Sequence, residues 1–240
     1  MNILILGGTG EARELAARLV ALGHAVTTSL AGRTSQPALP AGELRVGKFG
    51  GIPGLAGYLR ARRFDRLVDA THPYAGLISI NAVAAAQQSG IPLLRLMRPA
   101  WIEPAGAKWR RAASIEAAAE ALQPGATVLV TTGHEGLATL LERDDCRFVV
   151  RLIEPPELAL PRHARLLLGR PPYRLDDERA LFKREAIGQL VTKNSGGEQT
   201  AAKLVAAQEA CAEVIMIERP VYGPAVEVGS VEAAVGAIGV

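Results

Sequence analysis

The first residues of the chain join two hydrophobic periodicities through a glycine-rich turn. Residues 3–6 form an uninterrupted apolar run, which is typical of a parallel strand buried on both faces. From Glu11 onwards, apolar residues recur at intervals of three and four, at Leu15, Leu19 and Leu22, and this spacing predicts an amphipathic helix. The two patterns together predict a strand that leads directly into a helix, with the unpaired N–H groups of the first helical turn at the junction.

The same alternation continues along the chain. Strands are predicted at residues 24–30, 44–49, 91–97, 127–132, 148–153 and 214–217, and two more begin near residues 65 and 189. Helical patterns occupy residues 52–62, 114–122, 175–186, 198–211 and 230–238, and two others end near residues 89 and 143. Residues 101–109 contain Pro and Gly without a clear period, which places a domain boundary near residue 100. We therefore expect an α/β protein with two Rossmann-like, doubly wound parallel-sheet domains, residues 1–100 and 101–240, with a cleft between them.

Composition and charge limit the classes of function. Residues 1–100 carry 11 Lys and Arg against 5 Asp and Glu, and this excess suits an anionic small molecule such as a phosphorylated cofactor. Nucleic acid is not expected, because no basic run with interleaved aromatic residues occurs. No apolar run approaches the roughly 20 residues that span a bilayer, and the chain begins with a strand pattern rather than a signal peptide, so we expect a cytoplasmic protein without a membrane partner. Cys146 and Cys211 lack the spacing of a metal site, and no metal is expected.

The first glycine-rich turn is a candidate for binding a dinucleotide. Gly8, Thr9, Gly10 and Glu11 lie where a helix N-terminus would face a pyrophosphate. The match to the G-x-G-x-x-G fingerprint is imperfect, because Arg13 occupies the third glycine position when the pattern starts at Gly8. A tight strand-to-helix turn without a ligand therefore remains the alternative.

The end of the second predicted strand favours NADPH over NADH. An NAD site would carry Asp or Glu here, whereas this chain offers Ser29 and Arg33, which suit a 2′-phosphate. Arg33 could equally be a solvated loop residue. A second glycine turn, Gly50-Gly51, could let the backbone approach the cofactor closely or could serve only the turn.

Two further turns carry candidate chemistry at predicted strand ends. Pro73 fits the first position of a helix, which would place His72 and Tyr74 at the carboxyl edge of the sheet, although a lone His is more often structural. In the second half, Lys193, Asn194, Ser195, Gly196 and Gly197 precede a helical pattern and would form a site for a carboxylate or carbonyl ligand at its N-terminus. The alternative is an Asn or Ser helix cap with glycine for the bend.

Taken together, these turns resemble the precorrin-6A reductase family of cobalamin biosynthesis. The residues that carry the resemblance are Gly7-Gly8-Thr9-x-Glu11, Ser29-x-Ala31-Gly32-Arg33, Phe49-Gly50-Gly51, Asp69-Ala70-Thr71-His72-Pro73-Tyr74-Ala75, Arg98-Pro99-x-Trp101, Thr131-Thr132-Gly133, Lys193-Asn194-Ser195-Gly196-Gly197 and Arg219-Pro220. The matches extend from residue 7 to residue 220, and the Asp-Ala-Thr-His-Pro-Tyr-Ala and Lys-Asn-Ser-Gly-Gly motifs are the most specific.

The resemblance implies an NADPH-dependent oxidoreductase that reduces one carbon–carbon double bond of a tetrapyrrole, converting precorrin-6A to precorrin-6B, or a cobalt-bearing version of it. It leaves open transient contact with neighbouring pathway enzymes. In our hypothesis, Gly8 to Glu11, Ser29, Arg33, Gly50 and Gly51 bind the cofactor, and His72, Tyr74, Lys193, Asn194, Ser195 and Gly196 bind the substrate.

His72, Tyr74 and Lys193 are the candidate proton donors, and the sequence does not choose among them. The alternatives are a non-catalytic NADP-binding regulatory protein and a reductase of another conjugated small molecule. A short-chain reductase would carry a Tyr-x-x-x-Lys pair, which this chain lacks.

Overall fold

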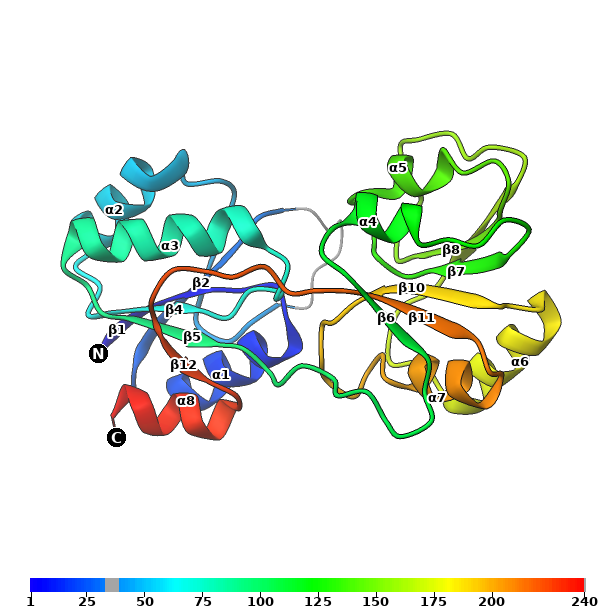
Figure 1. Cartoon of the computed structure of the whole chain (residues 1–240). Helices are drawn as coiled ribbons and strands as arrows, with labels where there is room; N and C mark the ends of the chain where they lie inside the picture. The colour runs from blue at the N-terminus through cyan, green and yellow to red at the C-terminus, as the bar shows by residue number, and fades with distance from the viewer. Residues whose placement is uncertain (33–38, 240) are drawn as a thin grey trace. The chain divides into compact units, whose positions relative to one another are not determined.

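The structure, a computed structural model, describes residues 1–32 and 39–239 and divides into two compact units. Unit 1 comprises Met1–Pro99 and Pro220–Val240, and unit 2 comprises Ala100–Arg219. Each unit is a parallel sheet with helices on both faces (Figure 1).

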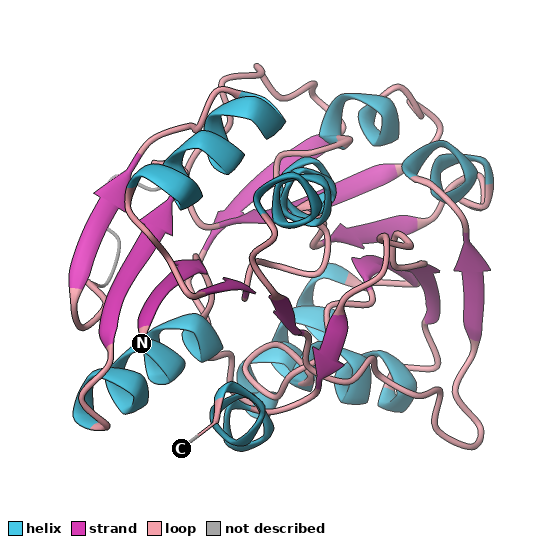
Figure 2. Ribbon diagram, turned by 90° about the vertical axis from the view of Figure 1, so that its left-hand side faces the viewer, coloured by secondary structure: helices cyan, strands magenta, loops and turns pink. Residues whose placement is uncertain are grey.

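The described part of unit 1 contains a six-stranded sheet in the order β12-β5-β4-β1-β2-β3, and every neighbouring pair is parallel. Its strands are β1 (Asn2–Leu6), β2 (Ala25–Leu30), β3 (Glu43–Val46), β4 (Arg66–Asp69), β5 (Leu93–Leu96) and β12 (Val226–Val228). Its helices are α1 (Gly10–Ala21), α2 (Gly51–Ala61), α3 (Gly76–Ser89) and α8 (Val231–Ile238). Helices α2 and α3 lie over one face of the sheet, and α1 and α8 cover the other (Figures 1 and 2).

The apolar run of β1 explains why both faces of this sheet are covered. Successive side chains of a strand point to opposite faces. Ile3 and Ile5 accordingly pack in the core beneath α1 and α8, whereas Leu4 and Leu6 pack in the core beneath α2 and α3. All four side chains are at most 2% exposed, so the strand predicted from this run is confirmed.

The described part of unit 2 repeats the architecture, with the strand order β6-β11-β10-β7-β8-β9 and parallel pairing throughout. Its strands are β6 (Trp109–Ala112), β7 (Thr127–Val130), β8 (Arg147–Leu152), β9 (Ala164–Leu168), β10 (Gln189–Lys193) and β11 (Glu213–Ile217). Its helices are α4 (Ile115–Glu120), α5 (Leu137–Leu141), α6 (Leu175–Glu185) and α7 (Ala202–Glu209). Helices α4 and α5 lie together on one face, and α6 and α7 lie on the other (Figure 1).

Unit 1 takes its sixth strand from an unexpected part of the chain. Strand β6 follows β5 in sequence but pairs with β11 of unit 2, and β12 follows β11 but pairs with β5 of unit 1. With these strands in place, both sheets have the doubly wound order of dinucleotide-binding folds. The predicted second domain, residues 101–240, therefore extends too far, because Pro220–Val240 belong to unit 1.

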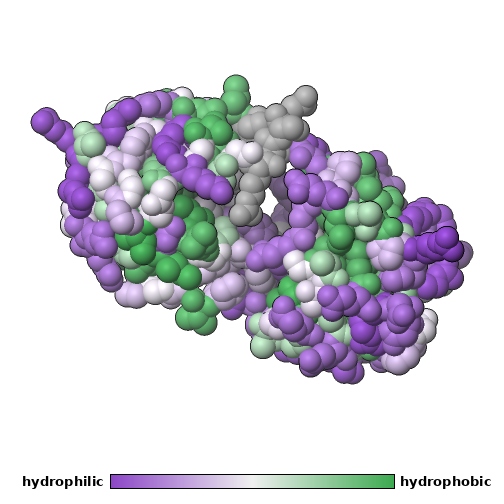
Figure 3. All heavy atoms as spheres, turned by 90° about the horizontal axis from the view of Figure 1, so that it is seen from above, coloured by the Kyte–Doolittle hydropathy of each residue, from purple (hydrophilic) through white to green (hydrophobic). Residues whose placement is uncertain are grey.

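Among residues 1–32 and 39–239, no helix has the length and apolar character needed to cross a membrane. Purple and green side chains are interspersed on the face seen in Figure 3, and apolar patches there lie among hydrophilic ones. No group of His, Cys, Asp and Glu that could hold a metal ion is found in this part of the chain.

Candidate functional site

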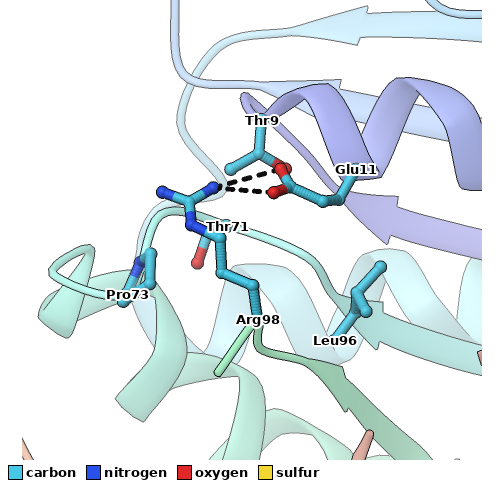
Figure 4. Close-up of a pocket in the computed structure, with 6 residues that line it drawn as sticks. All are labelled: Thr9, Glu11, Thr71, Pro73, Leu96 and Arg98. Carbon is cyan, nitrogen blue, oxygen red and sulfur yellow. Dashed lines mark hydrogen bonds and ion pairs between the residues drawn. The ribbon is translucent and has the colours of Figure 1, made fainter. Parts of the chain in front are cut away.

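The winding of each sheet reverses at one place, and the Gly8–Glu11 turn, His72 and Lys193 lie at these edges. In unit 1, β2 and β3 lie on one side of β1 and β4 lies on the other, so the carboxyl ends of β1 and β4 border the switch point at which doubly wound sheets bind ligands. A pocket opens at this edge (Figure 4). It is lined by Thr9, Glu11, Thr71, Pro73, Leu96 and Arg98.

The predicted glycine turn forms the strand-to-helix junction of this pocket. Gly8 has a φ of +120°, a conformation that favours glycine, and Thr9 is the N-cap of α1. The Thr9 hydroxyl accepts a hydrogen bond from the Ala12 N–H at 3.0 Å and donates one to the Ala70 carbonyl at 2.9 Å. This side chain therefore ties the α1 N-terminus to the end of β4, and the expected strand–turn–helix geometry is present. Pyrophosphate binding at the turn stays a prediction.

An ion pair at the mouth of the turn was not anticipated. The Arg98 guanidinium, at the end of β5, donates to both carboxylate oxygens of Glu11 at 3.0 and 3.1 Å (Figure 4). Burial alone would raise the pKa of Glu11, but its backbone hydrogen bond and the Arg98 charge lower the pKa below its usual value. The pocket volume of about 10 Å³ is room for one water molecule.

The predicted 2′-phosphate site contains an arginine that the sequence pattern did not single out. Ser29 and Arg45 are register partners on β2 and β3, and the Arg45 guanidinium donates to the Ser29 hydroxyl at 3.2 Å. The guanidinium also donates to the Gly47 carbonyl at 2.6 Å and stacks on the Phe49 ring, 3.8 Å from its centroid. Arg33 lies outside the described residues. Only the pairing of β2 with β3 could have identified Arg45.

The second glycine turn leads into α2. Gly50 and Gly51 have φ values of +83° and +81°, which other residues rarely adopt, and α2 begins at Gly51. The left-handed backbone is sufficient to explain both glycines. Close approach of a cofactor at this turn stays a prediction.

The His72-Pro73-Tyr74 segment lies at the carboxyl edge of unit 1, but the predicted helix start at Pro73 is wrong. Helix α3 begins at Gly76, because the chain first makes a tight turn in which the Ala75 N–H donates to the His72 carbonyl at 2.8 Å. The His72 side chain is exposed, and its Nδ1 accepts from the Tyr74 N–H at 3.3 Å. Their roles in substrate binding or proton transfer stay predictions.

A buried ionic group supports this segment from within the sheet. Arg95 of β5 is 1% exposed and pairs with Asp69 of β4 at 3.3 Å and with Glu227 of β12 at 2.8 Å. Asp69 in turn accepts from the Thr71 hydroxyl at 2.7 Å. Arg95 therefore links the returning strand β12 to the strand end that carries His72.

In unit 2 the switch point lies between β7 and β10, and Lys193 ends β10 at this edge. The Lys193 ammonium is 3.0 Å from the carboxylate of Glu135, which follows β7. The predicted helix start at residue 198 is wrong, since α7 begins at Ala202. The helix N-terminus expected directly after Lys193 is therefore displaced, and the intervening residues form an extended turn.

The Asn194 side chain has a structural task in this turn. Its Oδ1 accepts from the Trp101 N–H at 2.8 Å, and its Nδ2 donates to the Trp101 carbonyl at 3.2 Å. The Trp101 indole N–H then donates to the Gly197 carbonyl at 3.0 Å. The Lys-Asn-Ser-Gly-Gly motif is thereby held against Trp101. Substrate binding by Lys193, Asn194, Ser195 and Gly196 stays a prediction.

Comparisons with known proteins agree on one family. The family model described as "Precorrin-6x reductase CbiJ/CobK" matches residues 2–239. The precorrin-6A reductase of Rhodococcus erythropolis is 47% identical over 99% of this chain and 96% of its own, and that of Mycobacterium tuberculosis is 45% identical over 91% and 89%. A solved structure of CobK precorrin-6A reductase superposes with a TM-score of 0.93 at 36% identity, covering 99% of this chain and 96% of the other.

Proposed function

The chain belongs to the precorrin-6x reductase family, and we propose that NADPH, bound by unit 1, is its reductant. The reaction is the reduction of a carbon–carbon double bond of precorrin-6A in cobalamin biosynthesis. This activity sets aside the alternative of a non-catalytic regulatory protein. A cytoplasmic location and transient contact with neighbouring pathway enzymes stay predictions.

The observation that carries the NADPH proposal is the pairing of Ser29 with Arg45 beside the α1 N-terminus. The donor set fits a 2′-phosphorylated dinucleotide: backbone N–H groups of the first α1 turn suit a pyrophosphate, and a hydroxyl with a guanidinium suits a 2′-phosphate. The end of β2 carries no carboxylate, the group that an NAD site uses to hold the ribose. Arg33 is a second candidate cation for the same phosphate.

Within this proposal the cofactor supplies a hydride, and the chain positions the reactants. Thr9 fixes the α1 N-terminus against β4, and Gly8, Gly10 and Glu11 complete the phosphate-binding turn. Arg98 neutralises the Glu11 carboxylate, which would otherwise repel a pyrophosphate. On unit 2, the Lys193 ammonium suits a carboxylate of the substrate. When the substrate binds, its carboxylate would replace that of the exposed Glu135 as the partner of Lys193.

Fluorescence titration with NADPH and with NADH tests this proposal. We compare the wild type with Arg45→Ala and Arg33→Ala, and Arg147→Ala, an exposed arginine at the amino end of β8, is the control. Loss of one charged hydrogen bond to the 2′-phosphate costs about 1.5–3 kcal/mol of binding free energy. The variant that lacks the arginine bound to this phosphate, Arg45→Ala or Arg33→Ala, should therefore bind NADPH roughly tenfold to a hundredfold more weakly. NADH binding and the control should not change. Equal losses for both nucleotides, or no binding by the wild type, would refute the NADPH site.

A further inference from the structure

A buried lysine lies beside the Lys-Asn-Ser-Gly-Gly motif of unit 2. Lys203, on α7, is 5% exposed, and its Nζ donates a hydrogen bond to the Thr131 hydroxyl at 3.1 Å. The ammonium also lies 5.3 Å from the centroid of the Trp101 ring, and Trp101 is bonded to the Gly197 carbonyl. No sequence pattern identified this lysine, because it falls inside a helix as one polar residue among apolar ones.

The charged groups that face Lys203 do not fully compensate it. Arg151 of β8 and Glu178 of α6 form a buried ion pair with each other, and Arg151 stacks on the Tyr173 ring at 4.0 Å. The Glu178 carboxylate is therefore already engaged by the Arg151 guanidinium. Burial, reinforced by the Arg151 charge and opposed by Glu178, lowers the pKa of Lys203 to about 7. Lys203 therefore loses and regains a proton near neutral pH.

Thr131 connects this buried amine to the ligand edge of the sheet. It directly follows β7, beside β10 at the switch point, and its backbone N–H donates to the Val191 carbonyl at 3.0 Å. The Thr131 hydroxyl donates to the same carbonyl, but at 3.3 Å and in competition with the N–H, so its proton is weakly held. Thr131 is only half-buried, whereas Lys203 is almost completely enclosed. The hydroxyl can therefore turn its proton towards a ligand at the edge while it accepts from Lys203.

We propose that Lys203, acting through the Thr131 hydroxyl, supplies the proton that completes the reduction of precorrin-6A. The inference rests on the proposed function and adds to it the source of the proton. The reductant delivers a hydride to one carbon of the double bond, and the Thr131 hydroxyl gives its proton to the partner atom of the conjugated system. Thr131 Oγ1 regains a proton from Lys203 Nζ, which becomes a neutral amine and is later reprotonated by water.

This assignment differs from the three donors expected from the sequence. The Lys193 ammonium is engaged by the Glu135 carboxylate, and His72 lies exposed to water. Lys203 combines a near-neutral pKa with exclusion of water, the two properties that suit a general acid.

The dependence of kcat on pH tests the proton path. We measure NADPH oxidation with saturating precorrin-6A from pH 6 to pH 9, for the wild type, Lys203→Met, Lys203→Arg, Thr131→Val and Thr131→Ser. In the wild type, kcat should fall above a pH near 7, because deprotonated Lys203 cannot donate. Lys203→Met and Thr131→Val should lose this decline and lower kcat about 100-fold, the usual contribution of a general acid.

The conservative variants separate proton transfer from structure. An arginine keeps the positive charge but does not release its proton near neutral pH, so Lys203→Arg should be as slow as Lys203→Met. Thr131→Ser retains a hydroxyl and should approach the wild-type rate and pH profile. Lys183→Met, which alters an exposed lysine of α6, should not differ from the wild type.

The protonation of Lys203 can also be followed in the ligand-free protein, without any catalysis. In a Trp109→Phe background the fluorescence of Trp101 should titrate near pH 7, as the charge over its ring disappears, and Lys203→Met should abolish the transition. NADPH binding should be unchanged in every variant.

Several results would overturn the inference. If Thr131→Val keeps the wild-type rate and pH profile, Thr131 does not carry the proton, even if Lys203 variants fold poorly. If Lys203→Arg is fully active, the charge rather than the proton matters. A wild type that binds NADPH but does not oxidise it with precorrin-6A would overturn the proposed function together with this inference.

Discussion

Replacing Lys203 with Met should change how the stability of the protein depends on pH. The pKa of this lysine falls from its usual value of 10.5 to about 7 on folding, chiefly because burial removes the ammonium from water. Between these values the unfolded chain holds a proton that the folded chain has released. Stability therefore rises with pH in this window, by about 1.4 kcal/mol per pH unit, and the rise is absent when the residue is Met.

The magnitude is large enough to measure. From pH 7 to pH 10.5, the free energy of unfolding of the wild type should rise by about 5 kcal/mol more than that of Lys203→Met. From pH 7 to pH 9, this extra rise should be roughly 2.5 kcal/mol. Below a pH of about 7 both states carry the proton, so the difference should become constant. The comparison between variants removes the contribution of titrating groups that do not interact with Lys203.

Urea unfolding followed by tryptophan fluorescence is the assay. Both tryptophans of the chain, Trp101 and Trp109, belong to unit 2, so the signal reports on the unit that contains Lys203. The free energy of unfolding is measured at each pH for the wild type, Lys203→Met and the exposed control Lys183→Met. If the wild type and Lys203→Met show parallel pH dependence from pH 7 to pH 9, Lys203 remains charged in the folded state and the reasoning fails.

Three further substitutions test the buried contacts of the site. Asn194→Ala removes two hydrogen bonds to the Trp101 backbone and should lower the stability of unit 2 by roughly 2–3 kcal/mol, measured by urea unfolding. Arg95→Met leaves the carboxylate of Asp69 buried without its cation and should cost about 3–5 kcal/mol, measured by circular dichroism during unfolding. Lys193→Ala should raise the KM for precorrin-6A about tenfold, in steady-state kinetics, while the Kd for NADPH stays the same.

Each of these expectations has a result that contradicts it. A loss below 0.5 kcal/mol for Asn194→Ala, the size of a neutral surface change, would show that Trp101 is held by other contacts. Glu227→Gln changes a half-exposed partner of Arg95 and should cost far less than Arg95→Met; equal costs would argue against the buried pair with Asp69 as the main contact. An equal loss of NADPH affinity in Lys193→Ala would refute its assignment to the substrate.

The central strands of both sheets could be predicted from the sequence, because burial on two faces produces apolar runs such as that of β1. The strands β6, β9 and β12 were not predicted. All three lie at sheet edges and are short, and β6 and β12 contain charged residues that interrupt any apolar run. The return of β12 to unit 1 depends on its pairing with β5 and on the ion pair between Arg95 and Glu227, and neither leaves a local signal.

The candidate site was predictable where local turn chemistry defines it. The strand–turn–helix junction at residues 7–11 and the closing helix near residues 230–238 were both indicated by the sequence, and the structure adds that Thr9 caps α1 and Ser230 caps α8. Helices α3 and α7 begin later than the patterns suggested, because the residues before α3 form a local turn and those before α7 are held against Trp101. The sequence could not reveal Arg45 or Lys203 as site residues, because their importance comes from register and burial in the folded chain.

The most direct test of the account is the reaction itself, followed by mass spectrometry. The purified protein is incubated with precorrin-6A and NADPH that carries deuterium at the transferable position. One NADPH should be consumed per tetrapyrrole, and the product should contain one deuterium and one proton from the solvent. A tetrapyrrole of unchanged mass, in the presence of a protein shown to bind NADPH, would contradict the account.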